Sequence, residues 1–475
     1  MARLLVNDIV VLLPGIAGSR LGKDGKAVWD ISLGALSNAI LSLGGNIKRL
    51  ELDGDDPEAE YADDGVRELG LMPDLHFLPG LNWRIDGYGK LSKRFLTWFD
   101  LEAGQNYFEF PYDWRRDNRA HAHRLRRQSR EWLATWRARS GNRDARLILV
   151  AHSMGGLIAR YFLECTEDGW RDTRMLITFG TPYSGSLNAL DGLVNGQRKK
   201  LGPLTLIDLT QAMRSWPSAY QLLPTFRCID NGGEKLERLR DRPLPVGLSQ
   251  DAFASAVTFH DEIKTQVDSH LATEYEKTGG YDIRPVVGEF QRTSQSATLE
   301  GDSLQVLPSW RGADRGGDGT VPGLSSYPRE LYKSRAGVMF AAQKHGSLQN
   351  DDAVLTQLYG LLRGQPVPDE EYHIAIGRAG LDLALGYVTT EPLGLSVRSD
   401  QIGSTLEVLV THAGSGEVAR RATVTADSEE WQELEIAPVP PGDYRVRVAG
   451  PDVSPVVDVC TVLPATLTEP LDPSV

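Results

Sequence analysis

Cysteine is scarce in this chain of 475 residues, which has only Cys165, Cys228 and Cys460. The three lie far apart in the sequence, and none belongs to a C-x-x-C pair or a Cys/His cluster. This pattern excludes a disulfide framework and a zinc site, and we expect neither a metal nor any other cofactor. So few cysteines are typical of proteins in a reducing compartment, which predicts a cytoplasmic location.

Long apolar runs are also absent. No segment approaches the roughly 18 consecutive apolar residues that a membrane-spanning helix needs. The apolar run at 9–13 ends at Pro14 and Gly15, whereas the core of a secretory signal needs about 7–15 apolar residues. We therefore expect no signal peptide, in agreement with a cytoplasmic location.

Positive charge is in deficit, because 51 Lys and Arg stand against 64 Asp and Glu, a net charge of −13. Proteins that follow a phosphate backbone usually carry a basic stripe, so nucleic acid is not an expected partner. The arginine-rich stretch 115–139 could attract anionic headgroups, but apolar residues at helical spacing favour the solvated face of a packed helix. The acidic stretch 53–64 lacks the ligand spacing of a calcium loop and is interpreted as a solvated loop.

The chain does contain short β-branched runs that alternate with helical patterns, as in parallel strands joined by crossover helices. The predicted strands cover 9–13, 107–110, 147–151, 175–179, 285–287 and 338–341. The predicted helices cover 89–101, 121–138 and 351–362. The expected fold class is therefore α/β with a mostly parallel central sheet.

The pattern changes at 363–371, where Pro, Gly and acidic residues replace the helical spacing. Beyond this point, apolar and polar residues mostly alternate at 393–397, 406–410, 434–436 and 444–448. Short alternating strands separated by turns predict a small antiparallel, immunoglobulin-like sandwich. We therefore expect two domains, one over 1–365 and a β-sandwich over 372–475.

Ser153 lies where the predicted strand 147–151 runs directly into a helix, and it is flanked by Ala151 and Gly155. This context indicates a nucleophile elbow, in which the residues two before and two after the serine must be small. The elbow places the hydroxyl at a helix N-terminus, where the amide of Met154 can face a developing oxyanion. The alternative is a glycine-rich turn with an incidental serine.

A serine hydroxyl is a weak nucleophile, so it needs a histidine base that is oriented by a carboxylate. In folds with such an elbow the chain order is serine, acid, histidine. His345 follows the strand predicted at 338–341, whereas His373 and His412 lie in or next to the linker and the sandwich. His345 is therefore the predicted base, and a chance position on a surface loop is the alternative.

Asp318 is the predicted acid, because the glycines on both sides let the backbone present its carboxylate in a turn. Asp302 and Asp314 lie in the same long connection and remain competitors. An ordinary turn aspartate is the structural alternative for Asp318.

The loop at 14–19 should supply the second donor of an oxyanion hole, because it follows the first strand. Its glycines let the backbone come close to a bound carbonyl group. We predict that the N–H of Ile16 is this donor, with Ala17 as the next choice. The predicted oxyanion hole thus consists of the amides of Ile16 and Met154.

Together these segments resemble the lecithin:cholesterol acyltransferase-like family of α/β-hydrolases. The matching blocks are PGIAGS at 14–19, PYDWR at 111–115, AHSMGG at 151–156, TPYSGS at 181–186, YQLLP at 220–224, GDGTVP at 317–322 and His345. The resemblance spans roughly residues 8–365 and implies an α/β-hydrolase catalytic domain there. It also implies Ser153 as the nucleophile, Asp318 as the acid and His345 as the base.

The resemblance further implies lipid acyl esters as substrates and a mobile lid, for which 187–219 is the candidate. Its candidate substrate-binding residues are Leu204, Met213 and Trp216, although these side chains fit the core of inserted helices equally well. The chain departs from the family in lacking a secretion signal and a lid cysteine pair, and in adding the sandwich. We therefore do not expect an extracellular lipoprotein substrate.

The expected function is that of a serine-dependent lipid ester hydrolase of the lipase or phospholipase type, with peripheral membrane contact. One alternative is an acyltransferase that moves an acyl chain from a phospholipid to an alcohol. Another is a non-catalytic binding protein on a hydrolase scaffold. The C-terminal sandwich is a candidate surface for a protein partner.

Overall fold

The structure is a computed structural model. It describes residues 3–29, 47–72, 76–77, 84–196, 198–201, 204–272, 280–332, 337–363, 377–384 and 386–465. Within these ranges, no helix combines the length and the apolar content that crossing a bilayer requires.

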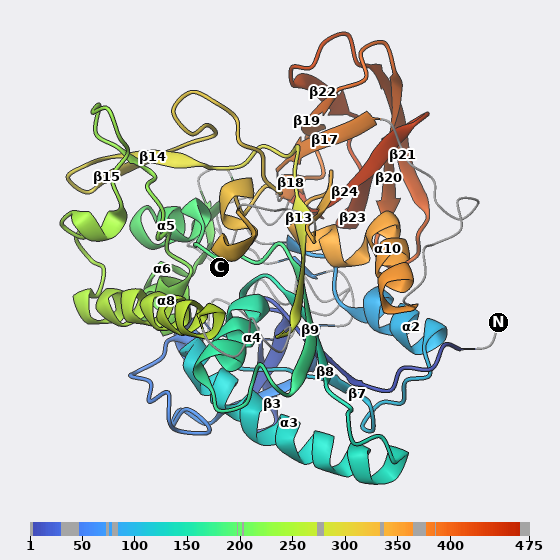
Figure 1. The fold of residues 1–475 in the computed structure, drawn as a ribbon. Helices are drawn as coiled ribbons and strands as arrows, with labels where there is room; N and C mark the ends of the chain where they lie inside the picture. The colour runs from blue at the N-terminus through green and yellow to red at the C-terminus, as the bar shows by residue number, and fades with distance from the viewer. Residues whose placement is uncertain are drawn as a thin grey trace.

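A six-stranded sheet forms the centre of the chain, in the order β16-β13-β9-β8-β1-β7 (Figure 1). Every pairing in it is parallel. Its strands are β1 (Ile9–Leu13), β7 (Tyr107–Glu109), β8 (Leu147–His152), β9 (Thr173–Phe179), β13 (Asp282–Gly288) and β16 (Met339–Ala341). All six predicted strands are confirmed. The inner strands β1 and β8 are buried at every position, as expected for strands covered on both faces.

Helices cover both faces of this sheet (Figure 1). Val11 of β1 points into a core shared with α3 and α4, whereas Val10 points into a second core shared with α2 and α10. The longest helix, α3, begins after Asp117, whose side chain accepts from the N–H of Arg119, and ends at the left-handed Gly141. The helices are α2 (Gly89–Trp98), α3 (Asn118–Ser140), α4 (Met154–Cys165), α5 (Leu187–Val194), α6 (Thr210–Ser215), α7 (Pro217–Gln221), α8 (Gln250–Leu271) and α10 (Asp352–Arg363).

Among the described residues, four small sheets and five 3-10 helices complete this part. The additional strands are β2 (Ser19–Lys23), β3 (Lys26–Trp29), β4 (Val66–Leu71), β5 (His76–Phe77), β6 (Arg84–Ile85), β10 (Arg198–Leu201), β11 (Leu204–Asp208), β12 (Ile229–Asp230), β14 (Ser296–Glu300) and β15 (Ser303–Leu307). The 3-10 helices are η1 (Ile47–Leu50), η2 (Leu239–Asp241), η3 (Gly323–Ser325), η4 (Arg329–Leu331) and η5 (His345–Asn350). The long insertion between β9 and β13 holds α5 to α8, and the predicted lid 187–219 is its first part.

The C-terminal part is an all-β unit of eight strands, in the order β21-β20-β23-β24-β17-β19-β22, with β18 paired to β24. The strands are β17 (Gly377–Leu383), β18 (Gly386–Val388), β19 (Leu393–Ser399), β20 (Thr405–His412), β21 (Val418–Thr425), β22 (Gln432–Ile436), β23 (Gly442–Gly450) and β24 (Val453–Leu463). The four predicted segments are all strands, but the sheet is not purely antiparallel, because β24 pairs in parallel with β17 and β18. Such pairings join segments far apart in the sequence, so strand patterns alone do not show them.

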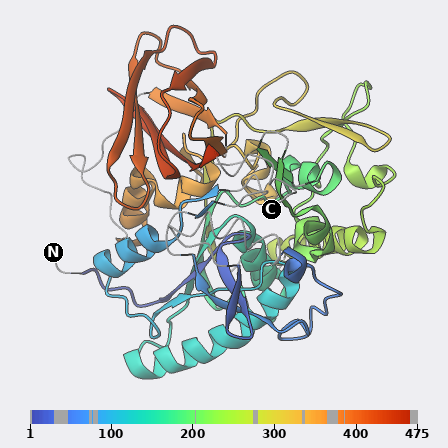
Figure 2. The same ribbon diagram turned by 180° about the vertical axis from the view of Figure 1, so that it is seen from behind.

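In two opposite views the C-terminal strands lie at one end of the parallel sheet, next to η5 and α10 (Figures 1 and 2). They surround their own apolar core, which contains residues from 379 to 462 only. Residues 364–376 lie outside the described ranges. The boundary between 365 and 372 therefore remains a prediction.

The acidic stretch 53–64 is mostly exposed, as predicted for a solvated loop, but Asp55 and Asp64 bind two buried arginines that lie just before α3. Arg116 is 2% exposed, and its Nε lies 2.7 Å from a carboxylate oxygen of Asp55. Its Nη1 also donates to the carbonyl of Glu60. Arg115 pairs in the same way with Asp64, at 2.8 Å. Helical spacing does not show that these two arginines, which precede α3, are buried against a distant loop.

Candidate active site

Ser153 occupies a strained turn between β8 and α4. Its φ of 53° and ψ of −124° are rare for a residue with a side chain, and its N–H donates to the carbonyl of Phe179. A Cβ on Gly155 would lie 2.3 Å from the carbonyl oxygen of Pro14, and one on Gly156 would lie 2.0 Å from Oγ1 of Thr181. Close approach of the backbone therefore requires glycine at both positions.

Ser153, His345 and Asp318 come together at the carboxyl ends of the parallel strands. Nε2 of His345 lies 3.0 Å from Oγ of Ser153, and Nδ1 lies 2.8 Å from Oδ2 of Asp318. Asp318 is fully buried, and Ser153 and His345 are 6% and 7% exposed. With Nδ1–H donating to the carboxylate, Nε2 is free to accept a proton from the serine hydroxyl.

The carboxylate of Asp318 is held by its own loop. Its Oδ1 accepts from the N–H groups of Thr320 and Val321, at 2.9 and 2.7 Å. The backbone N–H of His345 donates to the carbonyl of Asp318, at 2.8 Å. A Cβ on Gly288, the last residue of β13, would lie 2.3 Å from Cβ of Asp318. These contacts leave the carboxylate one orientation, toward the imidazole.

The competing residues lie elsewhere or outside the described ranges. Asp302 accepts from the N–H of Val246 in an exposed turn. Asp314 binds the side chain of Gln295. His412 ends β20 in the C-terminal unit, and His373 is among the residues that the structure does not describe.

Ile16 and Met154 lie next to Ser153, as the predicted oxyanion hole requires. Ile16, Ser153 and His345 line the same small pocket. Among the described residues, no hydrogen bond engages the N–H of Ile16, and the N–H of Met154, at the first position of α4, has no intrahelical acceptor. Ala17, the second choice, has a left-handed φ of 60°. The pocket has a volume of about 20 Å³, which is room for roughly one water molecule.

A buried network that the sequence did not reveal links the three loops of the site. Burial, assisted by the nearby charge of His345, lowers the pKa of His152 to about 3, so its ring is neutral. Nε2 of His152 lies 3.1 Å from the carbonyl of His345, which only accepts, so Nε2 carries the proton. Nδ1 then accepts from the hydroxyl of Tyr88 at 2.9 Å, and this hydroxyl accepts from the N–H of Gly15 at 2.7 Å.

Tyr88 thereby connects the loop 14–19, here called the oxyanion loop, to the turn at Ser153. His152 connects that turn to the loop that carries His345, here called the base loop. Burial raises the pKa of Tyr88, so its phenol remains a donor. Tyr88 lies just before α2, far from the other motifs in the sequence, where no local pattern singles it out.

The predicted lid residues take different places. Met213 and Trp216 are fully buried, and Nε1 of Trp216 donates to the carbonyl of Leu50. Neither side chain lines the pocket at Ser153, so for these two the structure favours the interpretation as core of inserted helices. The side chain of Leu204 lies outside the described residues. From the predicted lid, Ala189 of α5 does line the pocket.

The described residues contain no group of three or more His, Cys, Asp or Glu side chains that could hold a metal ion. Neither Cys165 nor Cys228 forms a disulfide bond. The contacts of His345 with Ser153 and Asp318 offer acid-base and nucleophilic chemistry.

Comparison with known proteins relates the middle of the chain to one family. Residues 85–244 match the family model of lecithin:cholesterol acyltransferase. The chain is 26% identical over 164 residues to the lysosomal phospholipase A and acyltransferase of Homo sapiens, a match that covers 34% of this chain and 38% of that protein. It is 25% identical over 169 residues to the phosphatidylcholine-sterol acyltransferase of Gallus gallus, covering 31% and 39%. The chain thus spans about two fifths of the length of these relatives.

Among solved structures, phospholipase PlaB from Legionella pneumophila is similar with a TM-score of 0.30 and 10% identity, covering 96% of this chain and 92% of that one. A likeness this low does not show a shared activity. The family match contains Ser153 and Met154 and ends before Asp318 and His345. Over residues 85–244, the chain is therefore similar to the lecithin:cholesterol acyltransferase family.

Proposed function

We propose that this protein is a serine-dependent lipid ester hydrolase that works through an acyl-enzyme on Ser153. One observation carries the proposal: the imidazole of His345 bridges the hydroxyl of Ser153 and the carboxylate of Asp318, at 3.0 and 2.8 Å. An incidental serine would have no reason to lie in line with a buried histidine and a buried carboxylate. The same observation disfavours a non-catalytic binding protein.

In the proposed reaction, Nε2 of His345 takes the proton of Ser153 as Oγ attacks the ester carbonyl carbon. The carbonyl oxygen becomes an oxyanion, which the N–H groups of Ile16 and Met154 stabilise. When the intermediate collapses, the bond to the leaving alcohol breaks and His345 protonates that alcohol. Water then attacks the acyl-enzyme in the same way, and the acid product leaves while Ser153 regains its proton.

The lipid nature of the substrate is supported by the relatives, whose names describe a phospholipase A and acyltransferase and a phosphatidylcholine-sterol acyltransferase. Those names also favour a second candidate, in which an alcohol replaces water as the acyl acceptor. A pocket of about 20 Å³ is too small for an acyl chain, so either reaction requires the wall formed by Ala189 and Leu222 to move. Contact with a lipid surface, which would deliver such a substrate, belongs to this proposal.

We also propose a cytoplasmic location, supported by the thiols of Cys165 and Cys228, neither of which forms a disulfide bond. Fractionation of cells that express the tagged chain tests it, and recovery from a membrane-enclosed compartment would contradict it.

The test of the activity is labelling with a fluorophosphonate, followed by assays on esters of increasing chain length and on phospholipids. Ser153→Ala should abolish labelling and lower turnover on the order of a millionfold, because the oxyanion hole and binding alone remain. Ser129→Ala is the matched control, since Ser129 is also buried but lies on α3. Unchanged labelling in the Ser153 variant would contradict the mechanism. Release of free fatty acid, as opposed to an acylated alcohol, distinguishes hydrolysis from transfer.

A further inference from the structure

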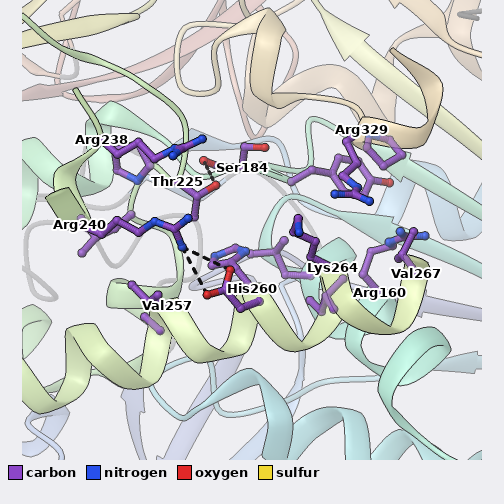
Figure 3. Close-up of a pocket in the computed structure, with 18 of the residues that line it drawn as sticks. Arg160, Ser184, Thr225, Arg238, Arg240, Val257, His260, Lys264, Val267 and Arg329 are labelled. Carbon is purple, nitrogen blue, oxygen red and sulfur yellow. Dashed lines mark hydrogen bonds and ion pairs between the residues drawn. The ribbon is translucent and has the colours of Figure 1, made fainter. Parts of the chain in front are cut away.

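A second cavity, of about 230 Å³, lies along α8 and does not include Ser153 (Figure 3). One wall is a stripe on α8 formed by Phe253, Ala256, Val257, His260, Asp261, Ile263, Lys264 and Val267. These positions are spaced by three or four residues and therefore share one face of the helix. From 253 to 267 the stripe advances by 14 residue steps, or about 21 Å at 1.5 Å per residue.

Five of the eight side chains in the stripe are apolar, and its charged members are Asp261 and Lys264. His260 near its middle is neutral, because burial lowers its pKa, and its Nε2 lies 2.8 Å from the carbonyl of Gln221. The opposite wall contains Leu157 of α4, Leu223 and Pro224. Phe253 and Val257 are only partly covered. An elongated apolar surface of this kind favours an alkyl chain over a compact polar ligand.

Cationic side chains stand at the two ends of the cavity (Figure 3). The cavity wall also contains two carboxylates, and both are already paired: Asp261 with Arg240 at 3.3 Å, and Glu330 with Arg160 at 2.5 Å. Asp268 pairs with Arg329 and lies 3.8 Å from Lys264. The guanidinium of Arg238 makes no hydrogen bond or ion pair with any described residue, although it lines the cavity. In a chain of net charge −13, an uncompensated guanidinium beside an apolar channel favours an anionic ligand group.

We propose that this cavity binds a long-chain fatty carboxylate, with its chain along α8 and its carboxylate on Arg238. A carboxylate satisfies the guanidinium through paired N–H···O bonds, which a neutral lipid of the same length does not offer. The cavity lies behind the segments 182–186 and 222–224, which contribute to its wall and to that of the Ser153 pocket. Binding here does not depend on catalysis by Ser153.

The test measures binding of laurate to the full-length Ser153→Ala protein by calorimetry, below the micelle-forming concentration. We expect one laurate per chain, at least tenfold weaker binding of methyl laurate, and weaker laurate binding at high salt. Arg238→Gln should weaken laurate binding at least tenfold, whereas Arg143→Gln, at an exposed arginine of another surface, should not.

Equal binding of laurate and methyl laurate, or no effect of Arg238→Gln, would overturn the assignment. Binding of several laurates per chain, insensitive to Ala256→Leu inside the cavity, would do the same. Because the Ser153 variant is used throughout, failure of this proposal and failure of the proposed catalysis give different results.

A separate set of contacts ties the C-terminal β-unit to the loop that carries His345. Gln343, two residues before His345, is 2% exposed. Its Oε1 accepts from the N–H of Val457 in β24 and from the N–H of Lys344, both at 2.9 Å. Its Nε2 donates to Asp351 at 3.2 Å. One side chain thus fixes the base loop against a strand of the C-terminal unit.

The loop of Asp318 has an equivalent connection through Gln291, which is fully buried. The backbone N–H of Gln291 donates to the carbonyl of Gly317 at 3.0 Å. Its side chain donates to the carbonyl of Ala379 at 3.1 Å and accepts from the N–H of Leu381 at 3.0 Å, both in β17. Two buried amides therefore connect the acid and base loops to β17 and β24.

We infer that the C-terminal unit is part of the catalytic apparatus, with Gln343 and Gln291 as positioning residues. This inference rests on the proposed function, since it concerns the alignment of His345 and Asp318. Removing either amide leaves backbone groups of the C-terminal unit without hydrogen-bond partners. The loop of His345 or the loop of Asp318 is then no longer fixed against that unit. We therefore expect the variants to lower kcat, which depends on the alignment of the catalytic groups, and to leave KM unchanged.

The test compares Gln343→Ala and Gln291→Ala with Arg292→Gln. Arg292 pairs with Asp382 across the same interface, but the pair is largely exposed. In folded protein, the two amide variants should lower kcat and the rate of fluorophosphonate labelling at least tenfold, with KM for a soluble ester unchanged and the pH profile of kcat displaced. Arg292→Gln should behave like the original chain.

If the alanine variants do not fold, Gln343→Met preserves the volume and removes only the hydrogen bonds. Full kcat in folded variants, with Ser153 still labelled, would overturn the inference and leave the proposed function intact. Absence of labelling in the unmodified chain would instead contradict the proposed function.

Discussion

Single hydroxyl and amide groups decide the geometry around Ser153. The hydroxyl of Tyr88 satisfies the N–H of Gly15 and Nδ1 of His152 at once, on two different loops. Because both partners are buried, water cannot replace the hydroxyl without a rearrangement. The position of the oxyanion loop relative to Ser153 therefore depends on this phenol.

Tyr88→Phe removes that hydroxyl while keeping the ring. We expect the free energy of unfolding to fall by about 1–3 kcal/mol, the cost of buried groups left without a partner. We expect kcat to fall by about tenfold, or about 1.4 kcal/mol of transition-state stabilisation, because the N–H of Ile16 loses its fixed position. Urea unfolding and ester kinetics measure the two effects.

Tyr107→Phe is the control, since its buried hydroxyl contacts Ser92 at 2.7 Å, away from the site. It should reduce stability and leave kcat per folded molecule unchanged. Equal kcat in the two variants would show that Tyr88 has only a structural role.

At the scale of elements, the stretch 53–64 and the residues just before α3 bind each other through hydrogen bonds and an ion pair. The stretch 53–64 supplies Arg116 with the carboxylate of Asp55 and the carbonyls of Asp56 and Glu60. The side chain of Asp55 is only 1% exposed. Forming a buried ion pair costs free energy, because both charges lose their hydration. Removing one partner leaves the other as a buried charge without compensation, which destabilises the fold.

Arg116→Ala should therefore lower the free energy of unfolding by about 3–5 kcal/mol. Arg421→Ala, which removes a largely exposed partner of Glu407, should cost about 0–1 kcal/mol. Denaturant unfolding of both variants measures the difference. Similar small losses in the two would mean that the buried pair contributes no more than an exposed one.

Elements differed in how far the sequence predicted them. The six parallel strands were predictable, because a strand covered on both faces is a short apolar run between turns. In β21 the residues that face the C-terminal core, Ala419, Ala422 and Val424, are only half-buried, and two of them are small, so its apolar pattern is weak. The contacts of Gln343 and Gln291 were not predictable, because their partners lie more than 80 residues away.

For the whole molecule, buried neutral histidines predict sensitivity to acid. Burial lowers the pKa of His121 to about 4 and that of His152 to about 3, and also lowers the pKa of His260. In the unfolded chain these groups titrate near pH 6.5. Below that pH the unfolded chain binds protons that the fold excludes, so stability falls as pH falls from about 6.5 toward 4.

The expected slope is up to about 1.4 kcal/mol per pH unit for each histidine. Burial raises the pKa of Asp86. This carboxyl therefore binds a proton more readily in the fold than in the unfolded chain, which opposes the loss of stability at the acid end of the range. Urea unfolding at about pH 7.5 and about pH 5 measures the slope. His121→Gln should flatten it, and a free energy of unfolding independent of pH over this range would contradict the prediction.

The sequence by itself determined the parallel sheet, the C-terminal strands and the order serine, acid, histidine. It could do so because burial pattern and turn chemistry are local, and because a sharp turn after an apolar strand accepts only small residues around Ser153. Only the tertiary structure decided which aspartate meets His345, that Met213 and Trp216 are core, and that Tyr88 and Gln343 hold the site. Those outcomes depend on hydrogen bonds between segments far apart in the chain, whose partners are specified by the packing of the whole fold and by no local pattern.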